Sequence, residues 1–394
     1  MREMDFSESN LRNRWLGYKG IWGLIQGEVQ GRVKGSLERW LREELKVAVG
    51  CGRYERRESR CGYRNGSYVR DLLTRYGWIE DLQVPRLRSG GYETEVFEKY
   101  RRRQRQLDWL LLEAFLLGHS TRKTIRVFKR AFGASLSPQT VSNVVKELDG
   151  ELRKYHRRQL GDDYAVLYLD GLWLTIRKPQ HLTKVLLVAL GMKSDGTMAL
   201  ISFQVADKES EACWWGFVSD LKQRGLRGES LEVIVTDGNA GLLKAIQAHY
   251  PRVRQQRCTF HQANNLAQHC DQSRHRRRMV QDALLIFEAA TQTEARKRLH
   301  AFVQTWSAKE PKALRNFLKG FEYCLTYLDY PEPWRSKLKT NNPIERYLEE
   351  INRRIIPMRS FNNTQSAERI IYGLIAYVLN QHQDVLEPDF TQKA

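Results

Sequence analysis

The chain has 394 residues, of which 41% are hydrophobic and 10% aromatic, so it can form two or three folded domains with a sizeable core. Lys and Arg number 65 against 46 Asp and Glu, and the net charge of +19 favours a polyanionic partner, most often nucleic acid, although it can also serve solubility alone. Six scattered cysteines without a CxxC pair exclude a disulfide scaffold. The absence of a signal core and of a run approaching about 18 apolar residues predicts a cytoplasmic protein that spans no membrane.

The first 105 residues predict two regions of different secondary structure. Residues 1–50 are predicted to be helical and interrupted by glycines, and residues 51–105 to form a small β-hairpin unit with an Asn65–Gly66 turn signal and Pro85 after a strand-like run. The apolar residues at helical spacings in the first region are Trp15, Ile21, Leu24, Ile25, Trp40, Leu41 and Leu45.

Residues 106–160 are predicted to be helical, and they contain two short helices with a brief joint. Ser120 or Thr121 can cap the first helix and Gly133 can end it, while Ser137–Pro138 begins the second. Basic flanks around such a pair indicate a helix-turn-helix for DNA binding, and a plain helical hairpin fits the pattern nearly as well.

From residue 161 the pattern becomes α/β. Strands are expected at 164–176, 183–193 and 197–205, then a helix over 209–224, a strand ending in "VTD", a helix, and a strand near 253–259. Residues 262–335 are helical in pattern, and a polar helix follows within residues 336–394. This order predicts a ribonuclease-H-like mixed sheet over residues 161–261, with a large α-helical insertion before the closing catalytic helix.

An aspartate interrupts the predicted buried strand "AVLYLDGLWLTI". Apolar residues flank Asp170 on both sides, and an ionised carboxylate is costly there unless a partner or a metal compensates its charge. Asp237 ends the apolar run "EVIVTD", and aspartates at strand ends of α/β sheets lie where ligands gather. Asp237 can alternatively cap the next helix. With Asp170 in the same domain, we favour a pair of metal ligands.

The polar helix near the C-terminus offers a third acid. Ile344, Leu348, Ile351 and Ile355 predict its buried stripe. Glu345 lies beside that stripe, Glu349 lies somewhat further round, and Glu350 lies on the opposite flank. An acid of the active site should border the face that packs on the sheet, which favours Glu345. Periodicity does not exclude Glu349, and a solvated glutamate paired with Arg353 or Arg354 is the structural alternative.

Three converging carboxylates favour hard divalent cations. Mg²⁺, for which Mn²⁺ can substitute, takes carboxylate and phosphate oxygens. Two such ions about 3.5–4 Å apart support in-line displacement at phosphorus. The acids, the predicted core and the basic charge therefore agree on phosphodiester chemistry.

Several segments resemble the Mutator-type transposases of insertion sequences. They include "LYLDGLWLTI", "VTDGNAGLLKAI", "QRCTFHQANNL", "TNNPIERYLEEINRR" and "ADKESEACWWGFVSDLKQRGL", and the resemblance extends over roughly residues 50–380. It implies a DDE transposase with an RNase-H-like domain, in which Asp170, Asp237 and Glu345 match the three catalytic, metal-binding acids. Where the family usually has an alanine before the "IER" run, this sequence has Pro343, which is compatible with a helix start.

The resemblance also covers a Cys and a His with two residues between them, matched here by Cys258 and His261. One Cys and one His do not complete a tetrahedral zinc site. We therefore expect His261 to be a neighbour of the active site and Cys258 to be a buried strand residue. His269, Cys270 and His275 have no standard zinc spacing.

These observations predict a metal-dependent DNA transposase that cuts at insertion-sequence ends and joins them to target DNA, as a dimer or higher oligomer associated with a prokaryotic nucleoid. The rivals are a domesticated transposase acting as a DNA-binding regulator and a metal-dependent nuclease with the same core. The expected DNA-binding residues are Arg101, Arg102, Arg103, Arg122, Lys123, Gln139, Asn143, Arg276, Arg277, Arg278, Arg353 and Arg354.

Overall fold

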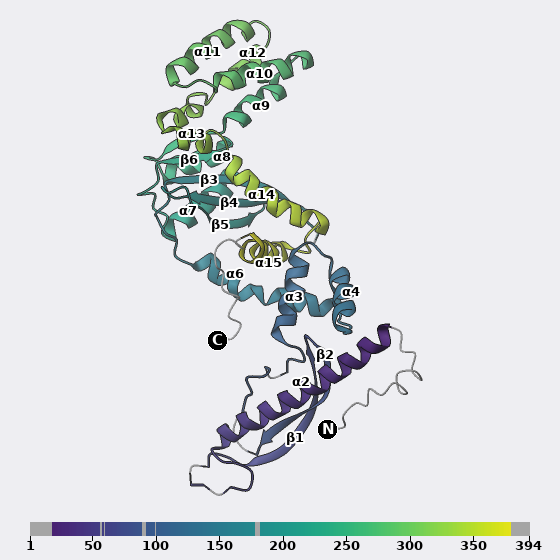
Figure 1. Cartoon of the computed structure of the whole chain (residues 1–394). Coiled ribbons are helices and arrows are strands. Elements are labelled where there is room, and N and C mark those ends of the chain that lie inside the picture. The colour runs from purple at the N-terminus through teal and green to yellow at the C-terminus, as the bar shows by residue number, and fades with distance from the viewer. Residues whose placement is uncertain are drawn as a thin grey trace. The chain divides into compact units, whose positions relative to one another are not determined.

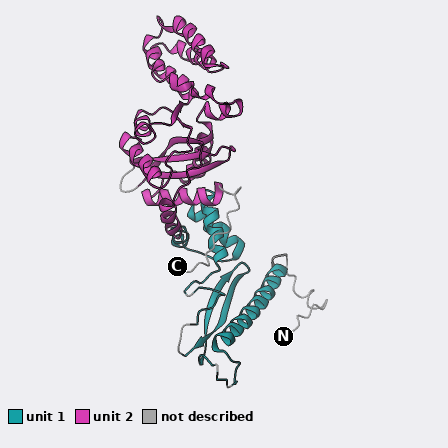
Figure 2. Ribbon diagram, turned by 90° about the vertical axis from the view of Figure 1, so that its left-hand side faces the viewer, with its two compact units in different colours: residues 1–146, 384–394 teal, residues 147–383 magenta. Residues whose placement is uncertain are grey.

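The structure is a computed structural model that describes residues 18–379, except residues 56, 59, 89–91, 99 and 178–181. It is a mixed α/β structure in two compact units, divided between residues 146 and 147 (Figure 2). Each unit is described by itself. Trp15, expected in the first helix, lies outside the described residues. No described helix combines the length and the apolar character needed to cross a bilayer.

The first unit begins with α2 (Tyr18–Val49), which packs on the hairpin of β1 (Arg64–Thr74) and β2 (Gly77–Leu87) (Figure 1). The glycines do not interrupt this helix as expected, because Gly20, Gly23, Gly27, Gly31 and Gly35 all lie within one continuous 32-residue helix. The core of this pair is contributed by Leu41 from the helix and Leu72, Ile79, Leu82 and Val84 from the strands. Ile21, Leu24 and Ile25, which lie at helical spacings in the sequence, are exposed on this helix.

The hairpin turn is not at Asn65–Gly66. Thr74 pairs with Gly77, so the turn consists of Arg75 and Tyr76. Gly66 instead has a positive φ of 68° at a register shift within the first strand. The Asn65–Gly66 pair therefore lies in a bulge-like irregularity of the strand, where the glycine takes the left-handed conformation. Asn-Gly pairs occur in such irregularities as well as in hairpin turns.

Three helices complete the first unit: α3 (Arg105–Leu116), α4 (Thr121–Phe132) and α5 (Pro138–Lys146). The predicted ends of the last two are confirmed. Ser120 caps α4 by accepting from the Lys123 amide, and Gly133 ends it in the left-handed conformation. The buried residues Thr124 and Phe128 on α4 and Val141, Val144 and Val145 on α5 leave the basic side chains on the outer face.

The second unit begins with α6 (Leu148–Arg157) and contains a five-stranded mixed sheet in the order β5-β4-β3-β6-β7. β3 (Val166–Ile176), β4 (Leu182–Met192) and β5 (Met198–Ala206) are antiparallel. β6 (Val233–Thr236) is parallel to β3, and β7 (Arg254–Arg257) is parallel to β6. All five strands lie where the sequence predicts them.

Two helices, α7 (Glu211–Gln223) and α8 (Ala240–His249), pack on the sheet through a core that includes Trp214, Phe217 and Leu242. On the helices that close the chain, α14 (Asn342–Ile355) contacts β3 and α15 (Thr364–Leu374) contacts β5 and α6. The sheet is therefore covered by helices, which explains its uniformly apolar strands.

Residues 262–335 are helical and contain no strand, as predicted. The block consists of α9 (Thr259–His269), α10 (Arg276–Ile286), α11 (Gln292–Trp306), α12 (Pro311–Leu318) and α13 (Glu332–Leu338), with short turns at Ser273–His275, Glu322–Cys324 and Thr326–Asp329. Its two ends meet, because the amide and the hydroxyl of Thr259 both donate to the carbonyl of Lys339, over 3.1 and 3.0 Å. The chain thus leaves the sheet and returns to it at one place.

Candidate active site

Asp170 lies in the middle of β3, the central strand of the sheet. Its Oδ1 atom accepts from the amide of Gly171 over 2.8 Å, and its Oδ2 atom accepts from the side-chain amide of Asn341 over 3.0 Å. Burial, together with the negative charges of Asp237 and Glu345, raises the pKa of Asp170 to about 7, against the lowering effect of the Gly171 amide and of His261. The carboxylate is therefore held in a place that favours its neutral form unless a cation is present.

Asp237 lies just beyond β6, beside Asp170. The parallel pairing joins Tyr168 to Val235, so each aspartate lies two residues beyond the same pair. The alternative role of Asp237 as a helix cap is wrong, because Asn239 caps α8 by accepting from the amides of Gly241 and Leu242. The Asp237 carboxylate accepts only the amide of Asn239, over 2.9 Å, among the interactions of the described residues.

Glu345 lies in the first turn of α14, the helix that contacts β3. Its Oε1 atom is 3.5 Å from Nδ1 of His261. Glu349, one turn further along, is exposed. Glu350 forms the ion pairs that the sequence analysis gave as the structural alternative, since it pairs with Arg353 over 2.7 Å and with Arg354 over 3.7 Å. Of the three glutamates, Glu345 is the one that contacts His261 and whose charge raises the pKa of Asp170.

His261 lies in the first turn of α9, next to Glu345. Cys258 is buried as expected but is not a strand residue, because it lies between the end of β7 and the start of α9. One ligand atom from each of these three residues lies within 4.8 Å of the others. A hydrogen bond with Cys258, and then the charges of Cys258, Glu345 and Asp237, raise the pKa of His261 to about 9. Sequence reasoning treated Cys258 and His261 as an incomplete ligand pair and did not foresee that Glu345 supplies a third donor.

The donor atoms fit a divalent cation. Glu345 Oε1 and Asn341 Oδ1 are buried and, within the described part of the chain, have no hydrogen-bond partner. The positive charge of His261 lowers the pKa of Asp170 but does not offset the effect of its burial, so a bound cation would stabilise the ionised carboxylate. Carboxylate and amide oxygens suit a hard ion such as Mg²⁺, whereas the Cys258–His261–Glu345 group offers softer donors that suit zinc.

Two residues near the acids were not singled out in the sequence. Asn341 is fully buried and holds the carboxylate of Asp170. Glu209 follows β5, and a Cβ atom on Gly171 would lie 3.7 Å from its carboxyl group. Burial and the charge of Asp237 raise the pKa of Glu209. The available signals were the polar runs "TNNP" and "DKES" directly before helices.

The expected DNA-binding residues fall into three groups. Arg101 and Arg103 are ion-paired with the buried Asp108 and so stabilise the first unit. Arg353 and Arg354 pair with Glu350. The exposed side chains that remain are Arg102, Arg122, Lys123, Gln139, Asn143, Arg276, Arg277 and Arg278. Gln139 donates to Asn143 over 2.7 Å along α5, and Arg278 lies 4.0 Å from Asp282.

Comparison with known proteins gives a consistent result. The profile of the family described as "Transposase, Mutator family" matches residues 23–385. A transposase for insertion sequence element ISRM5 of Rhizobium meliloti is 33% identical over 352 residues, which cover 89% of this chain and 87% of that protein. A transposase for element IS256 in transposon Tn4001 of Staphylococcus aureus is 33% identical over 327 residues, or 82% of each chain. A match over nearly the whole chain leaves one conclusion: the protein belongs to the Mutator family of transposases.

Proposed function

We propose that this transposase is a DDE enzyme with a ribonuclease-H-like core, which cuts DNA at the ends of an insertion sequence and joins the freed ends to target DNA. The observation that carries this proposal is the position of Asp170 and Asp237 on paired strands, with Glu345 on α14 close enough for its charge to raise the pKa of Asp170. The strand order, with three antiparallel strands followed by two parallel ones, supports the assignment of the core.

The three acids would hold two Mg²⁺ ions, for which Mn²⁺ would substitute. Bound divalent cations supply Lewis acidity at the phosphate and at the attacking oxygen. The chain itself supplies position and charge. Asn341 fixes Asp170, and the pairing of β3 with β6 fixes Asp237 beside it. His261 lies 3.5 Å from Glu345 and, being protonated at neutral pH, adds a positive charge close to where a phosphate would bind.

DNA binding is proposed for the exposed basic residues. Arg122 and Lys123 on α4 and Gln139 and Asn143 on α5 would contact the terminal inverted repeat in the manner of a helix-turn-helix. Contacts from several Arg and Lys side chains make binding fall steeply with salt. Two ends must be held together for joining, so we propose a dimer or higher oligomer on DNA.

The test uses purified full-length protein, Mg²⁺ and a labelled terminal-repeat duplex. Asp170→Asn, Asp237→Asn and Glu345→Gln should each reduce cleavage and joining by about a thousandfold or more while DNA binding remains. Glu349→Gln is the matched control, because Glu349 lies on the same helix but is exposed. If Glu349→Gln impairs cleavage as much as Glu345→Gln does, the assignment of the third acid is wrong.

The same assay separates the rivals. A regulator would bind the duplex without cutting it, and a nuclease would cut without joining. A transposase does both with one set of acids.

A further inference from the structure

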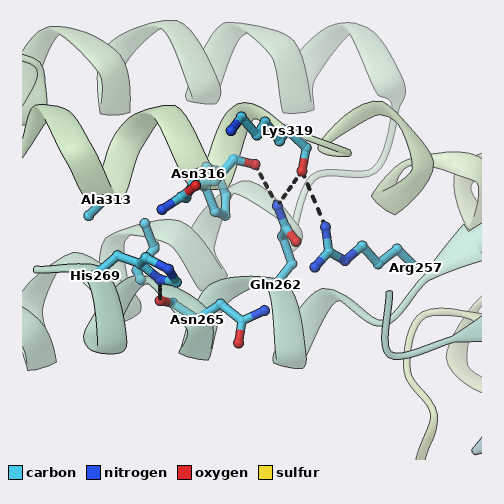
Figure 3. Close-up of a pocket in the computed structure, with 9 residues that line it drawn as sticks. Arg257, Gln262, Asn265, His269, Ala313, Asn316 and Lys319 are labelled. Atoms are coloured by element: carbon cyan, nitrogen blue, oxygen red, sulfur yellow. Dashed lines mark hydrogen bonds between the residues drawn. The ribbon is translucent and has the colours of Figure 1, made fainter. Parts of the chain in front are cut away.

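A cavity of about 220 Å³ lies between α9 and α12, in the helical block of the second unit (Figure 3). Arg257, the last residue of β7, forms part of its wall. The Nε atom of Arg257 donates to the main-chain carbonyl of Asp237 over 3.3 Å, and its Nη1 atom donates to the carbonyl of Lys319 over 3.2 Å. The cavity therefore adjoins the backbone of one of the proposed catalytic acids.

The wall of the cavity is positively charged. Arg257 and Lys319 contribute the charge, and none of the nine lining residues is acidic. Within the described ranges, neither Arg257 nor Lys319 has an ion pair with a carboxylate. Two cations without acidic partners, one of them held in place by two carbonyls, favour an anionic group such as phosphate.

The remaining lining combines amides with an apolar floor. The floor consists of Leu266, Ala313 and Phe317, all buried. The half-buried amides of Asn265 and Asn316 have no hydrogen-bond partner within the part of the chain that the structure describes. Figure 3 shows Asn265 on α9 and Asn316 on α12, on the two sides of the cavity.

A third amide makes the cavity rigid rather than offering a contact. The Nε2 atom of the buried Gln262 donates to the carbonyls of Phe317 and Lys319, the latter over 3.3 Å. These bonds fix the end of α12 against α9. The space between the helices is thus formed before any ligand arrives.

These three features match the phosphate and the base of one nucleotide. The cations suit the phosphate, the free amides suit the polar edges of a base, and the apolar floor suits its face. At about 220 Å³ the cavity is smaller than the 300–1,000 Å³ typical of pockets for drug-sized ligands. That size suits a single unpaired base rather than a large cofactor.

We propose that this cavity holds one unpaired nucleotide of the DNA end, extruded from the duplex next to the phosphate that is cut. The inference rests on the proposed function, because only DNA bound at the acids brings a nucleotide to Arg257. Extrusion would leave the neighbouring phosphate exposed, and it would give the enzyme a means of recognising a correctly positioned end.

The experiment measures base unstacking without catalysis. Full-length protein is bound to terminal-repeat duplexes that carry 2-aminopurine at successive positions around the cleavage site, in buffer with a chelator. We expect the fluorescence to rise at one position when the protein binds. Asn265→Leu and Asn316→Leu should abolish the rise and lower the cleavage rate by about tenfold in Mg²⁺, since each removes an amide from the base.

Asn264→Leu is the matched control. Asn264 is the half-buried neighbour of Asn265 on α9 and does not line the cavity. It should keep both the fluorescence rise and the cleavage rate. Thermal melting shows that all variants are folded, and a mismatch that unpairs the responsive base should restore part of the cleavage lost in Asn316→Leu.

The outcomes separate this inference from the proposed function. No fluorescence rise at any position, or equal effects of Asn264→Leu and Asn265→Leu, overturns the cavity assignment even if cleavage depends on the acids. Saturable binding of free deoxynucleoside monophosphates without any response from the duplex assigns the cavity to a free nucleotide and also overturns the proposal. A rise in fluorescence with Asp170→Asn still active would leave the cavity assignment standing and refute the acids.

Discussion

The side-chain amide of Asn341 donates a hydrogen bond to the carboxylate of Asp170 over 3.0 Å, although 171 positions separate the two residues. Between them lie the rest of the sheet and the whole helical block. The main-chain amide of Asn341 also donates to Sγ of Cys258 over 3.4 Å. One residue before α14 thus connects the strand-borne aspartate with the Cys258–His261–Glu345 group.

Replacing Asn341 tests this connection. We expect Asn341→Leu to weaken Mg²⁺ binding by about tenfold or more, because a carboxylate without its orienting partner loses its position. The concentration of Mg²⁺ that gives half-maximal cleavage measures the effect. Asn342→Leu, at the exposed next residue, should leave that concentration unchanged. Equal effects of the two variants would show that Asn341 acts only through helix stability.

Asp170 should limit the stability of the metal-free protein. Its pKa is raised from 3.8 to about 7, so ionisation in the folded state costs about 4 kcal/mol at alkaline pH. Because the folded pKa is the higher one, the folded protein gains stability as the pH falls from about 7 toward 4. Asp170→Asn should raise the Tm of the metal-free protein at pH 8 by several degrees and make the Tm less dependent on pH in that window.

The Mg²⁺ dependence of the Tm provides the complementary measurement. The parent protein should be stabilised by Mg²⁺, and Asp170→Asn should not. If Asp170→Asn is less stable than the parent at pH 8, the ionised Asp170 does not destabilise the metal-free protein.

Zinc should inhibit cleavage supported by Mg²⁺. Cys258 and His261 offer soft donors, and Glu345 would be drawn away from the aspartates when zinc binds the three together. Cys258→Ser should raise the zinc concentration that halves the cleavage rate by about tenfold. Cys213→Ser, at a half-buried cysteine of α7 outside this group, is the control. Unchanged inhibition in Cys258→Ser would show that zinc acts elsewhere.

Gly238 is required for the arrangement of Arg257. It has a φ of +94°, and a Cβ atom there would lie 1.9 Å from Nε of Arg257. Gly238→Ala should therefore displace Arg257 from the carbonyl of Asp237, destabilise the fold by about 2 kcal/mol or more, and reduce cleavage. Gly216→Ala is the control. Nothing lies within 4 Å of a Cβ atom at Gly216 on α7, so this change should stabilise the protein by about 0.5–1 kcal/mol in denaturant unfolding.

The strands and the long helical block were predictable because their signals are local. Apolar runs mark the buried strands, and the period of the apolar residues places Glu345 beside the buried face of its helix. The hairpin turn was predicted at the wrong place, because Asn65–Gly66 has the same local preference in a strand irregularity as in a turn.

The partners of the acids were not predictable from local pattern. Asn341 meets Asp170 only after the helical block has closed on itself, and Glu209 comes near Asp237 only through the packing of the sheet. The continuity of α2 across its glycines has a related cause. Contacts with the hairpin, such as those of Leu41, stabilise a helix that its own residues disfavour.

The double hydrogen bond from Thr259 to Lys339 has a consequence for how this protein can change over evolutionary time. The helical block between these residues starts and ends at this pair of hydrogen bonds. Helices of the block can therefore be lengthened, shortened or replaced without moving β3 and α14, which carry Asp170 and Glu345.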